Sequence, residues 1–307
     1  MQSILTTHHL RKEFGRKVAV ADLTIEVQAG EIFGFLGPNG AGKTTSVKML
    51  LSLTRPSSGS ATLLGQPLGD RLARARVGYL PEHFRFHEWL TAAEFLDLHG
   101  KLYGMAKTER DEAVPRLLAL VGLIGRANTK LSAFSKGMLQ RIGLAQALIN
   151  DPDLVFLDEP TSGLDPLGRR LVRDIIKSLS ERGTAVFLNS HLLSEVEKTC
   201  DRVAFIRDGR ILQTSTLEAF EQGSLRVILR VGDPSPQLLA GLASFDPDAS
   251  LERANGYITL HLDNEDRLPQ LAKWIVSQEQ ALYELTPIRL SLEDRFLQIV
   301  GEDASEG

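Results

Sequence analysis

The chain has 307 residues, of which 43% are hydrophobic and 24% are charged, and this composition is ordinary for a globular protein with a sizeable core. Its formal net charge of −4 does not favour nucleic acid or anionic lipid as a principal partner. The single cysteine, Cys200, excludes an intramolecular disulfide. No stretch approaches the roughly 18 consecutive apolar residues of a membrane-spanning helix, and residues 1–15 lack the apolar run of a secretory signal.

Strands and helices are predicted to alternate over the first two thirds of the chain. Val18–Val27 and Glu31–Leu36 are rich in β-branched and aromatic residues, which favours strands. The glycine-rich turn Gly37–Gly42 follows, and apolar residues then recur at helical spacing from Lys43. A short apolar run at Leu154–Leu157 is typical of a buried parallel strand. A helix at Leu171–Leu179 and a strand at Ala185–Asn189 come next, so the order predicts an α/β core with a parallel sheet.

A group of helices is expected between these strands. Thr91–Glu94 fits a capping box at the start of a helix that Gly104 ends. A second helix is expected over Pro115–Val121, with Pro115 in its first turn because an interior proline would break the helix. Apolar residues from Leu139 to Ile149 form a third helical stripe.

After about Thr216 the pattern changes, and a second, smaller domain is predicted. Asn255-Gly256, at the centre of a predicted hairpin, is a strong turn signal. The order strand, helix, hairpin, helix, strand indicates a ferredoxin-like α+β domain. Its expected elements are strand Leu225–Val231, helix Ser235–Leu242, hairpin Leu251–Leu262, helix Leu268–Val276, strand Ala281–Leu285 and a final helix Leu292–Val300.

The turn Gly37–Thr44 matches the pattern G-x-x-x-x-G-K-[ST] of a phosphate-binding P-loop. Its glycines let backbone N–H groups approach phosphate oxygens, and the positive end of the following helix points at them. Lys43 would neutralise the β- and γ-phosphates of ATP, and the Thr44 hydroxyl would ligate Mg²⁺. The expected nucleotide contacts in this turn are Gly37, Pro38, Asn39, Gly40, Ala41, Gly42, Lys43, Thr44 and Thr45.

Two acids, Asp158 and Glu159, end the apolar run at Leu154–Leu157. Buried carboxylates are costly unless a cation or hydrogen-bond donors meet them. Asp158 suits the Mg²⁺ shell that a P-loop requires, and Glu159 suits a general base that activates water. Taken alone, such a pair is more often a strand end that meets solvent, but beside a P-loop the functional interpretation is favoured.

The segment Leu131–Arg141 resembles the signature motif of the ATP-binding cassette (ABC) family, which usually reads LSGGQ. Here its core is Phe-Ser-Lys-Gly-Met, a variant similar to the drug- and polysaccharide-exporting branches of that family. Ser135 and Gly137 are kept, whereas Lys136 and Met138 replace the usual residues. Ser135 stands where a helix is expected to begin, so its hydroxyl and the free N–H groups nearby favour an anion site.

Other ABC family marks follow the family's order, and each alone has an ordinary structural explanation. Phe14 resembles the aromatic that stacks on adenine, although it would also pass for a core phenylalanine. Ser162–Pro166, which contains Asp165, resembles the D-loop that joins two active sites in the family. His191 matches the switch histidine that contacts the γ-phosphate. The resemblance spans about Leu5 to Gln213 and implies that these residues line an ATP site.

One residue departs from the family pattern. Glu82 stands where the family normally has the glutamine of its Q-loop. A carboxylate oxygen can still approach Mg²⁺ or the attacking water, so the resemblance assigns Glu82 to the metal site beside Thr44 and Asp158. Unlike a glutamine, Glu82 has no side-chain N–H group and cannot donate the hydrogen bond of an amide.

The resemblance implies an ATPase subunit that dimerises head to tail and drives transport, with export favoured, through separate membrane-spanning subunits. Such a subunit is cytoplasmic and peripheral on the inner face of the cell membrane, uses ATP and Mg²⁺, and needs no nucleic acid. We expect a nucleotide-binding domain over residues 1–220, with a helical subdomain at about 83–135, and an accessory domain over 221–307. Residues 290–297 resemble an ending common among exporter-type cassettes.

Phe84, Phe86 and Trp89 form an aromatic cluster in a polar stretch, and this cluster has two interpretations. They are expected either to form the surface that receives the membrane subunit or to pack internally. Two other functions also compete with the transporter subunit. A soluble ABC ATPase acting on nucleic acid or ribosomes is disfavoured because the chain has a single cassette and no basic run. A non-hydrolysing ATP switch is disfavoured by Lys43 and Glu159.

Overall fold

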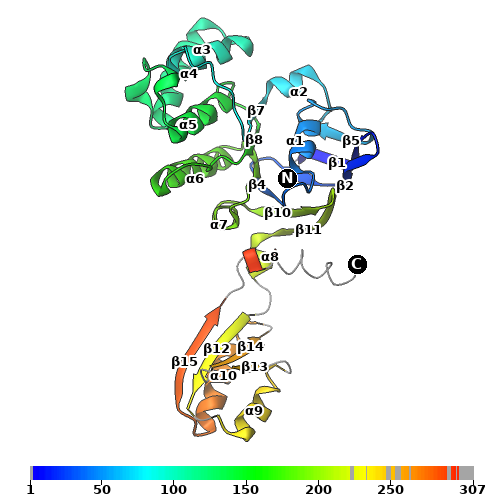
Figure 1. The fold of residues 1–307 in the computed structure, drawn as a ribbon, viewed down its shortest axis with the longest axis vertical. Helices are drawn as coiled ribbons and strands as arrows, with labels where there is room; N and C mark the ends of the chain where they lie inside the picture. The colour runs from blue at the N-terminus through cyan, green and yellow to red at the C-terminus, as the bar shows by residue number, and fades with distance from the viewer. Residues whose placement is uncertain are drawn as a thin grey trace. The chain divides into compact units, whose positions relative to one another are not determined.

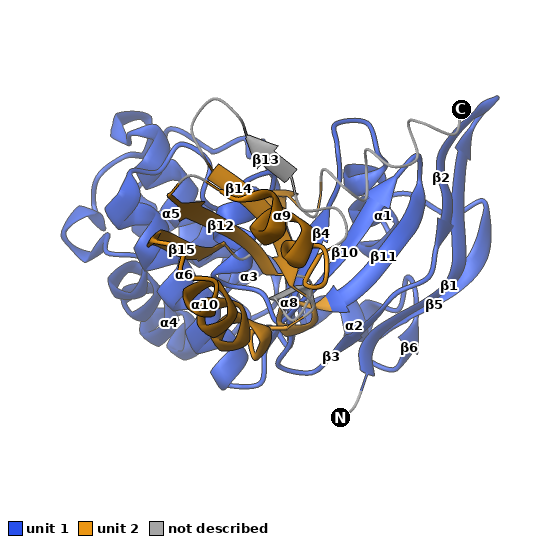
Figure 2. Ribbon diagram, turned by 90° about the horizontal axis from the view of Figure 1, so that it is seen from below, with its two compact units in different colours: residues 1–215 blue, residues 216–307 orange. Residues whose placement is uncertain are grey.

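The computed structural model describes residues 3–221, 225–232, 234–246, 250–252, 257–262, 264–288, 292–294 and 296. The chain forms two compact units, residues 1–215 and 216–307, which Figure 2 colours blue and orange. The sequence-based boundary between residues 220 and 221 lies a few residues further along the chain. Across the described ranges, no helix is both long and apolar enough to cross a membrane.

Unit 1 is built on an 11-stranded sheet with the order β6-β5-β1-β2-β11-β10-β4-β9-β8-β7, to which β3 adds by pairing with β1 (Figure 1). Strands β10, β4, β9, β8 and β7 are parallel to one another, and β11 pairs parallel with β2, whereas β1 pairs antiparallel with both β2 and β5. The strands are β1 (Ser3–Phe14), β2 (Lys17–Leu23), β3 (Glu26–Gln28), β4 (Ile32–Leu36), β5 (Ser58–Leu63), β6 (Gln66–Pro67), β7 (Val77–Leu80), β8 (Leu154–Asp158), β9 (Ala185–Asn189), β10 (Arg202–Arg207) and β11 (Arg210–Thr216).

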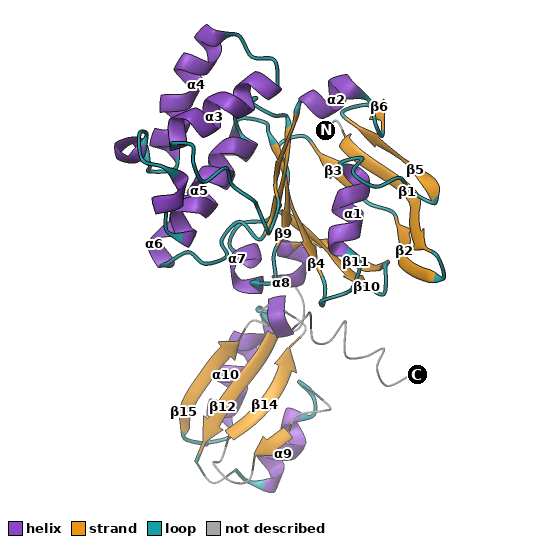
Figure 3. Cartoon of the chain, turned by 45° about the horizontal axis from the view of Figure 1, so that its top comes forward, coloured by secondary structure: helices purple, strands orange, loops and turns teal. Residues whose placement is uncertain are grey.

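The helices of unit 1 lie on both sides of the parallel strands (Figure 3). Helix α1 lies on the side of β1, β2 and β5, and α3 to α6 lie on the other. The expected capping box of α3 is confirmed, since Glu94 N–H donates to Thr91 Oγ1 at 3.3 Å and Thr91 N–H to Glu94 Oε2 at 2.8 Å. The helices are α1 (Lys43–Leu50), α2 (Arg71–Ala75), α3 (Ala92–Leu102), α4 (Lys107–Leu120), α5 (Lys136–Ala147), α6 (Pro166–Glu181) and α7 (Leu193–Glu197), with 3-10 turns at Ile124–Arg126 and Leu131–Ala133; the short helix α8 (Leu217–Glu221) begins unit 2.

The prediction for Pro115 was wrong. This proline lies inside α4, not in a first turn, because the helix already begins at Lys107. Glu109 accepts the N–H of Ala106 at 2.6 Å, which stabilises that earlier start. The missing N–H of the proline costs one helical hydrogen bond, and the burial of Ala113 and Leu117 offsets it.

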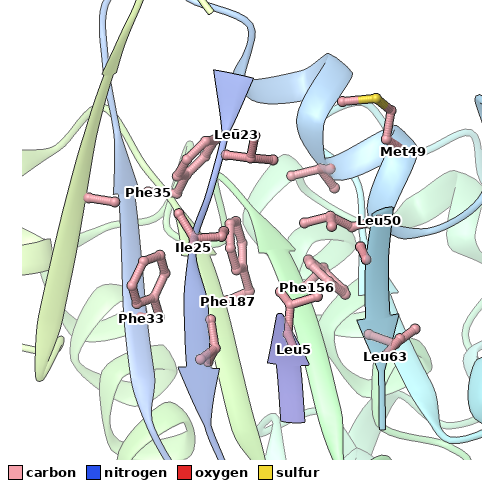
Figure 4. Close-up of a cluster of buried hydrophobic side chains, with 14 of the residues drawn as sticks. Leu5, Leu23, Ile25, Phe33, Phe35, Met49, Leu50, Leu63, Phe156 and Phe187 are labelled. Carbon is pink, nitrogen blue, oxygen red and sulfur yellow. The ribbon is translucent and has the colours of Figure 1, made fainter. Parts of the chain in front are cut away.

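The core of unit 1 fills the space between the parallel strands, α1 and the antiparallel strands (Figure 4). Phe187 of the central strand β9 is its hub, with ring centroids 5.6 Å from Phe33, 5.2 Å from Phe35 and 5.1 Å from Phe156. Leu5 of β1 and Leu50 of α1 are also fully buried there. These contacts join the neighbouring strands β4, β9 and β8 within one core.

After α8, unit 2 forms a four-stranded antiparallel sheet with the order β13-β14-β12-β15, covered by the helices α9 and α10, and this confirms the ferredoxin-like prediction. Alternate residues of β12, from Leu225 to Val231, are buried against the helices. The elements are β12 (Leu225–Val231), α9 (Pro236–Leu242), β13 (Ser250–Glu252), β14 (Tyr257–Leu262), α10 (Arg267–Ser277) and β15 (Leu282–Ile288). The predicted turn Asn255-Gly256 and most of the predicted helix Leu292–Val300 lie outside the described residues.

Candidate functional site

The predicted P-loop connects β4 to α1, as the strand–turn–helix pattern requires. Its glycines are needed, since a Cβ on Gly37 would lie 2.2 Å from the Ile206 carbonyl oxygen, and Gly42 has a φ of +105°. Lys43 Nζ donates to the carbonyl oxygens of Gly37 at 2.6 Å and Pro38 at 3.1 Å. The loop therefore holds its lysine across the turn, where a phosphate would meet it.

A hollow of about 690 Å³ lies over the P-loop and joins segments far apart in sequence. It contains six of the expected P-loop residues together with Glu82, Glu159 and His191, all predicted from the sequence. Asn189 and Asp208 also line it and were not predicted. The complete lining is Lys17, Val18, Ala19, Asn39, Gly40, Gly42, Lys43, Thr44, Thr45, Glu82, Glu159, Asn189, His191 and Asp208.

Asp158 ends β8 and is buried, with 3% of its surface exposed. Asn189 Nδ2 donates to its Oδ1 at 2.5 Å. Burial raises the pKa of Asp158 above its ordinary value, and the nearby carboxylates of Glu82 and Glu159 raise it further. A cation beside Asp158 would remove this cost.

Glu159, the next residue, adopts an unusual backbone conformation with a φ of +54° and is also buried. Its Oε1 accepts the backbone N–H of His191 at 2.8 Å, and its Oε2 lies 2.8 Å from His191 Nδ1. The hydroxyl of Ser190 donates to Oε2 at 3.4 Å. The predicted base and the predicted switch histidine are therefore in direct contact at the edge of the hollow.

Lys43 brings the opposite charge to the same hollow. Burial lowers its pKa, while the carboxylates of Glu159, Asp158 and Glu82 act in the other direction. Glu82 itself is exposed, and its Oε1 is 3.9 Å from His83 Nε2. Glu82, the residue that departs from the family pattern, thus lines the same hollow as Lys43, and its negative charge acts on that lysine.

The predicted signature and D-loop residues lie in another hollow, of about 530 Å³. Ser135 caps α5 by accepting the Met138 N–H at 3.3 Å, as expected for a helix start, and Asp165 caps α6 by accepting the Gly168 N–H at 2.7 Å. Ser135, Gly137 and Asp165 line this hollow, and none of its lining residues also lines the hollow over the P-loop. Within one chain, the two groups of predicted residues are therefore separate.

Phe14 ends β1 and does not line the hollow over the P-loop. Its ring is 54% exposed and carries Lys12 Nζ 4.8 Å from its centroid, so it is not a core residue. Phe14 pairs with Lys17 across the β1–β2 hairpin, and Lys17 does line the hollow. An exposed ring beside the hollow is available for stacking on a planar group.

The oxygen groups at the P-loop fit a magnesium ion held together with a nucleotide. Thr44 and Asp158 supply a hydroxyl and a carboxylate, which are the hard oxygen ligands that Mg²⁺ prefers. Asn189 Oδ1, at the same place, is a buried acceptor without a hydrogen-bond partner. Over the described part of the chain there is no cluster of three or more His, Cys, Asp or Glu side chains able to hold a metal. The set therefore suits an ion that also takes phosphate and water oxygens.

The aromatic cluster at residues 84–89 divides in two. The rings of Phe84 and Phe86 are 4.5 Å apart and lie 5.9 and 5.7 Å from Phe95 of α3, so both pack internally. Trp89 is 69% exposed and touches only the ring of His87 among the described aromatic contacts. Of the three aromatics, Trp89 is thus the one that remains available to a partner.

Comparison with known proteins places the chain in one family. A family model described as ABC transporter matches residues 20–162. The chain is 46% identical over 286 residues to an uncharacterized ABC transporter ATP-binding protein, sll0415, of Synechocystis, covering 91% of this chain and 78% of that protein. It is 36% identical to the Nod factor export ATP-binding protein I of Rhizobium johnstonii, covering 95% and 93%.

Solved structures agree with these sequence relatives. The ATP-binding subunit of an ABC transporter superposes with a TM-score of 0.67 and 30% identity, covering 71% of this chain and 92% of that one. The ATP-binding cassette MJ0796, solved as a dimer bound to ADP and phosphate, superposes with a TM-score of 0.64 at 24% identity, covering 69% and 98%, and shows the same fold. The chain therefore belongs to the ATP-binding proteins of the ABC transporter family.

Proposed function

We propose that this chain binds ATP with Mg²⁺ and hydrolyses it, as the motor of an exporter whose membrane-spanning subunits are separate chains. One observation carries the proposal. A single hollow contains the P-loop lysine, a buried carboxylate suited to a general base and the histidine in contact with it. The same groups match the sequence motifs of the family, so geometry and motif support the same activity.

In the proposed reaction, the N–H groups of the P-loop and Lys43 bind the β- and γ-phosphates of ATP. Thr44, Asp158 and Glu82 are the residues that would hold Mg²⁺, and the bound ion would neutralise phosphate charge. Glu159 accepts a proton from the water that attacks the γ-phosphorus. His191 keeps its Nδ1 on the carboxylate of Glu159, which leaves Nε2 for a γ-phosphate oxygen.

The separation of the two hollows supports a homodimer as the working form. Ser135, Gly137 and Asp165 lie apart from the P-loop of their own chain, so they would complete the ATP site of a second copy. Two copies arranged head to tail give two equivalent sites related by a two-fold axis. The exposed ring of Phe14 would stack on the adenine of its own site.

Export is favoured by the relatives named for Nod factor export, one of which covers 95% of this chain. We place the protein in the cytoplasm, bound to the inner face of the membrane through its transporter subunits. Trp89 is the exposed aromatic that suits this contact. Trp89→Ala should then weaken pull-down by the membrane subunits while nucleotide binding is unchanged, and an unchanged pull-down would argue against this surface.

The central test is steady-state ATPase activity of the purified chain and of Glu159→Gln across a range of protein concentrations. Loss of a general base lowers turnover about 10²- to 10⁴-fold, so the variant should be nearly inactive. Activity per chain should rise with protein concentration if the site needs two copies. Glu181→Gln makes the same chemical change at the exposed end of α6 and should leave turnover unchanged. A Glu159→Gln chain as active as the parent would refute the proposed role of Glu159.

A further inference from the structure

The backbone of Glu159 is held by two distant parts of unit 1. Its N–H donates to the carbonyl oxygen of Asn189 at 2.8 Å. Its own carbonyl oxygen accepts the N–H of Ser162 at 3.1 Å and, from helix α5, the side-chain amide of Gln140 at 3.0 Å. Both lone pairs of that oxygen are therefore used, one of them by a residue 19 positions earlier in the chain.

These bonds matter because Glu159 has a φ of +54°, a region that residues with a Cβ seldom occupy. Such a conformation persists only where the surrounding contacts hold it, and it is concentrated at functional sites. The direction of the Glu159 carboxylate depends on this backbone turn. The Gln140 amide is the one side-chain donor, among the described hydrogen bonds, that holds the Glu159 carbonyl.

The first turns of α5 contact the segment after β8 at Glu159, Gly163 and Leu164. A Cβ added to Gly163 would lie 2.8 Å from Lys136 Cδ, so the stem of Lys136 already covers that glycine. Gln140 is one turn further along the same helical face as Lys136. The helix that Ser135 begins is therefore in contact, at two successive turns, with the loop that carries the general base.

We propose that Gln140 is a positioning residue, which fixes the backbone of Glu159 and thereby directs its carboxylate at the attacking water. This inference rests on the proposed role of Glu159 as general base. It also gives the signature helix two tasks, because the helix carries Ser135 for one ATP site and holds Glu159 for the other. If α5 moves when its Ser135 contacts the nucleotide of a second copy, Gln140 would shift the position of Glu159 in the chain to which α5 belongs.

The test is a double-mutant cycle between Gln140→Met and Glu159→Gln in the full-length chain. Methionine keeps the length of the side chain and removes the donor. We expect kcat to fall about tenfold, the effect of one hydrogen bond, with KM for ATP within about twofold of the parent. In the Glu159→Gln background the same substitution should change single-turnover hydrolysis by less than about twofold, because a positioning residue acts only through its target.

Two further variants guard against a general effect on folding. Gln146→Met makes the same change on the same helix, about 9 Å further along its axis, and should leave kcat unchanged. Gln140→Glu has almost the shape of glutamine but, as a carboxylate, has no hydrogen-bond donor, and should reproduce the loss seen with methionine. The thermal midpoint of each variant shows how much of any loss comes from unfolding.

The possible outcomes separate the two proposals. Parent-like kcat in both Gln140 variants, with Glu159→Gln inactive, would overturn the positioning role and leave the proposed function intact. An equal loss from Gln140→Met in the parent and in the Glu159→Gln chain would also overturn it. Full activity of Glu159→Gln would overturn both proposals together.

Discussion

The ion pair between Arg173 of α6 and Glu195 of α7 joins the helix after the D-loop to the helix after His191. Arg173 Nη1 lies 2.6 Å from Glu195 Oε2, and the two side chains are 23% and 10% exposed. Breaking a buried pair costs about 3–5 kcal/mol, whereas exposed pairs contribute about 1 kcal/mol or less. Because this pair is only partly exposed, we expect Arg173→Met to lower the free energy of unfolding by about 2–3 kcal/mol.

The two partners should not be equivalent. Arg173→Met leaves the more deeply buried carboxylate without its partner, whereas Glu195→Gln keeps an oxygen that accepts from Arg173 and should cost about 1 kcal/mol. The double variant should be more stable than the sum of the two predicts, by about 1–2 kcal/mol, because it leaves no unpaired charge.

Urea unfolding measures these differences in the free energy of unfolding. The chain has two tryptophans, Trp89 in unit 1 and Trp274 in unit 2. In a Trp274→Phe background the fluorescence signal therefore comes from unit 1, which contains the ion pair. A coupling energy below about 0.5 kcal/mol would refute the reasoning, since solvent would then screen the pair as it screens an exposed one.

Two more predictions concern the site and its support. Glu82→Gln removes a negative charge that adds to burial in raising the pKa of Asp158. The acidic limb of the pH–rate profile should move to lower pH, because Asp158 stays ionised further into acid; an unmoved limb would show that Glu82 does not act on Asp158. Phe187→Ala removes the ring at the hub of the core and should cost about 3–5 kcal/mol in urea unfolding, whereas a loss below about 1 kcal/mol would contradict that packing.

Local signals account for the parts of the fold that the sequence predicts well. The P-loop, the capping box at Thr91 and the N-cap at Ser135 each depend on a few neighbouring residues, and the structure has all three. Strand β1 (Ser3–Phe14) was missed, because its buried residues do not alternate regularly and its role depends on pairing with β2, β3 and β5. Tertiary contacts similarly decide where α4 begins.

The site divides along the same line. The sequence motifs pointed to Lys43, Glu159 and His191 as site residues. No local sequence signal indicated that Gln140 of α5 and Asn189 of β9 hold the backbone of Glu159. The left-handed backbone of Glu159 was also beyond prediction, since glutamate has no preference for that conformation. Motifs identify the candidate residues of the site, whereas long-range hydrogen bonds hold the backbone of Glu159.

The charged groups Asp158 and Lys43 suit a ligand that carries both positive and negative charge. Burial raises the pKa of Asp158 and lowers the pKa of Lys43, so the fold disfavours the charged form of each group. A cation relieves the first cost and an anion the second, and Mg²⁺ with the phosphates of ATP supplies both at once. A ligand that relieves these costs binds the folded chain and not the unfolded chain, so it raises the free energy of unfolding of unit 1. The same burial that disfavours these two charges therefore favours binding of a ligand that neutralises both.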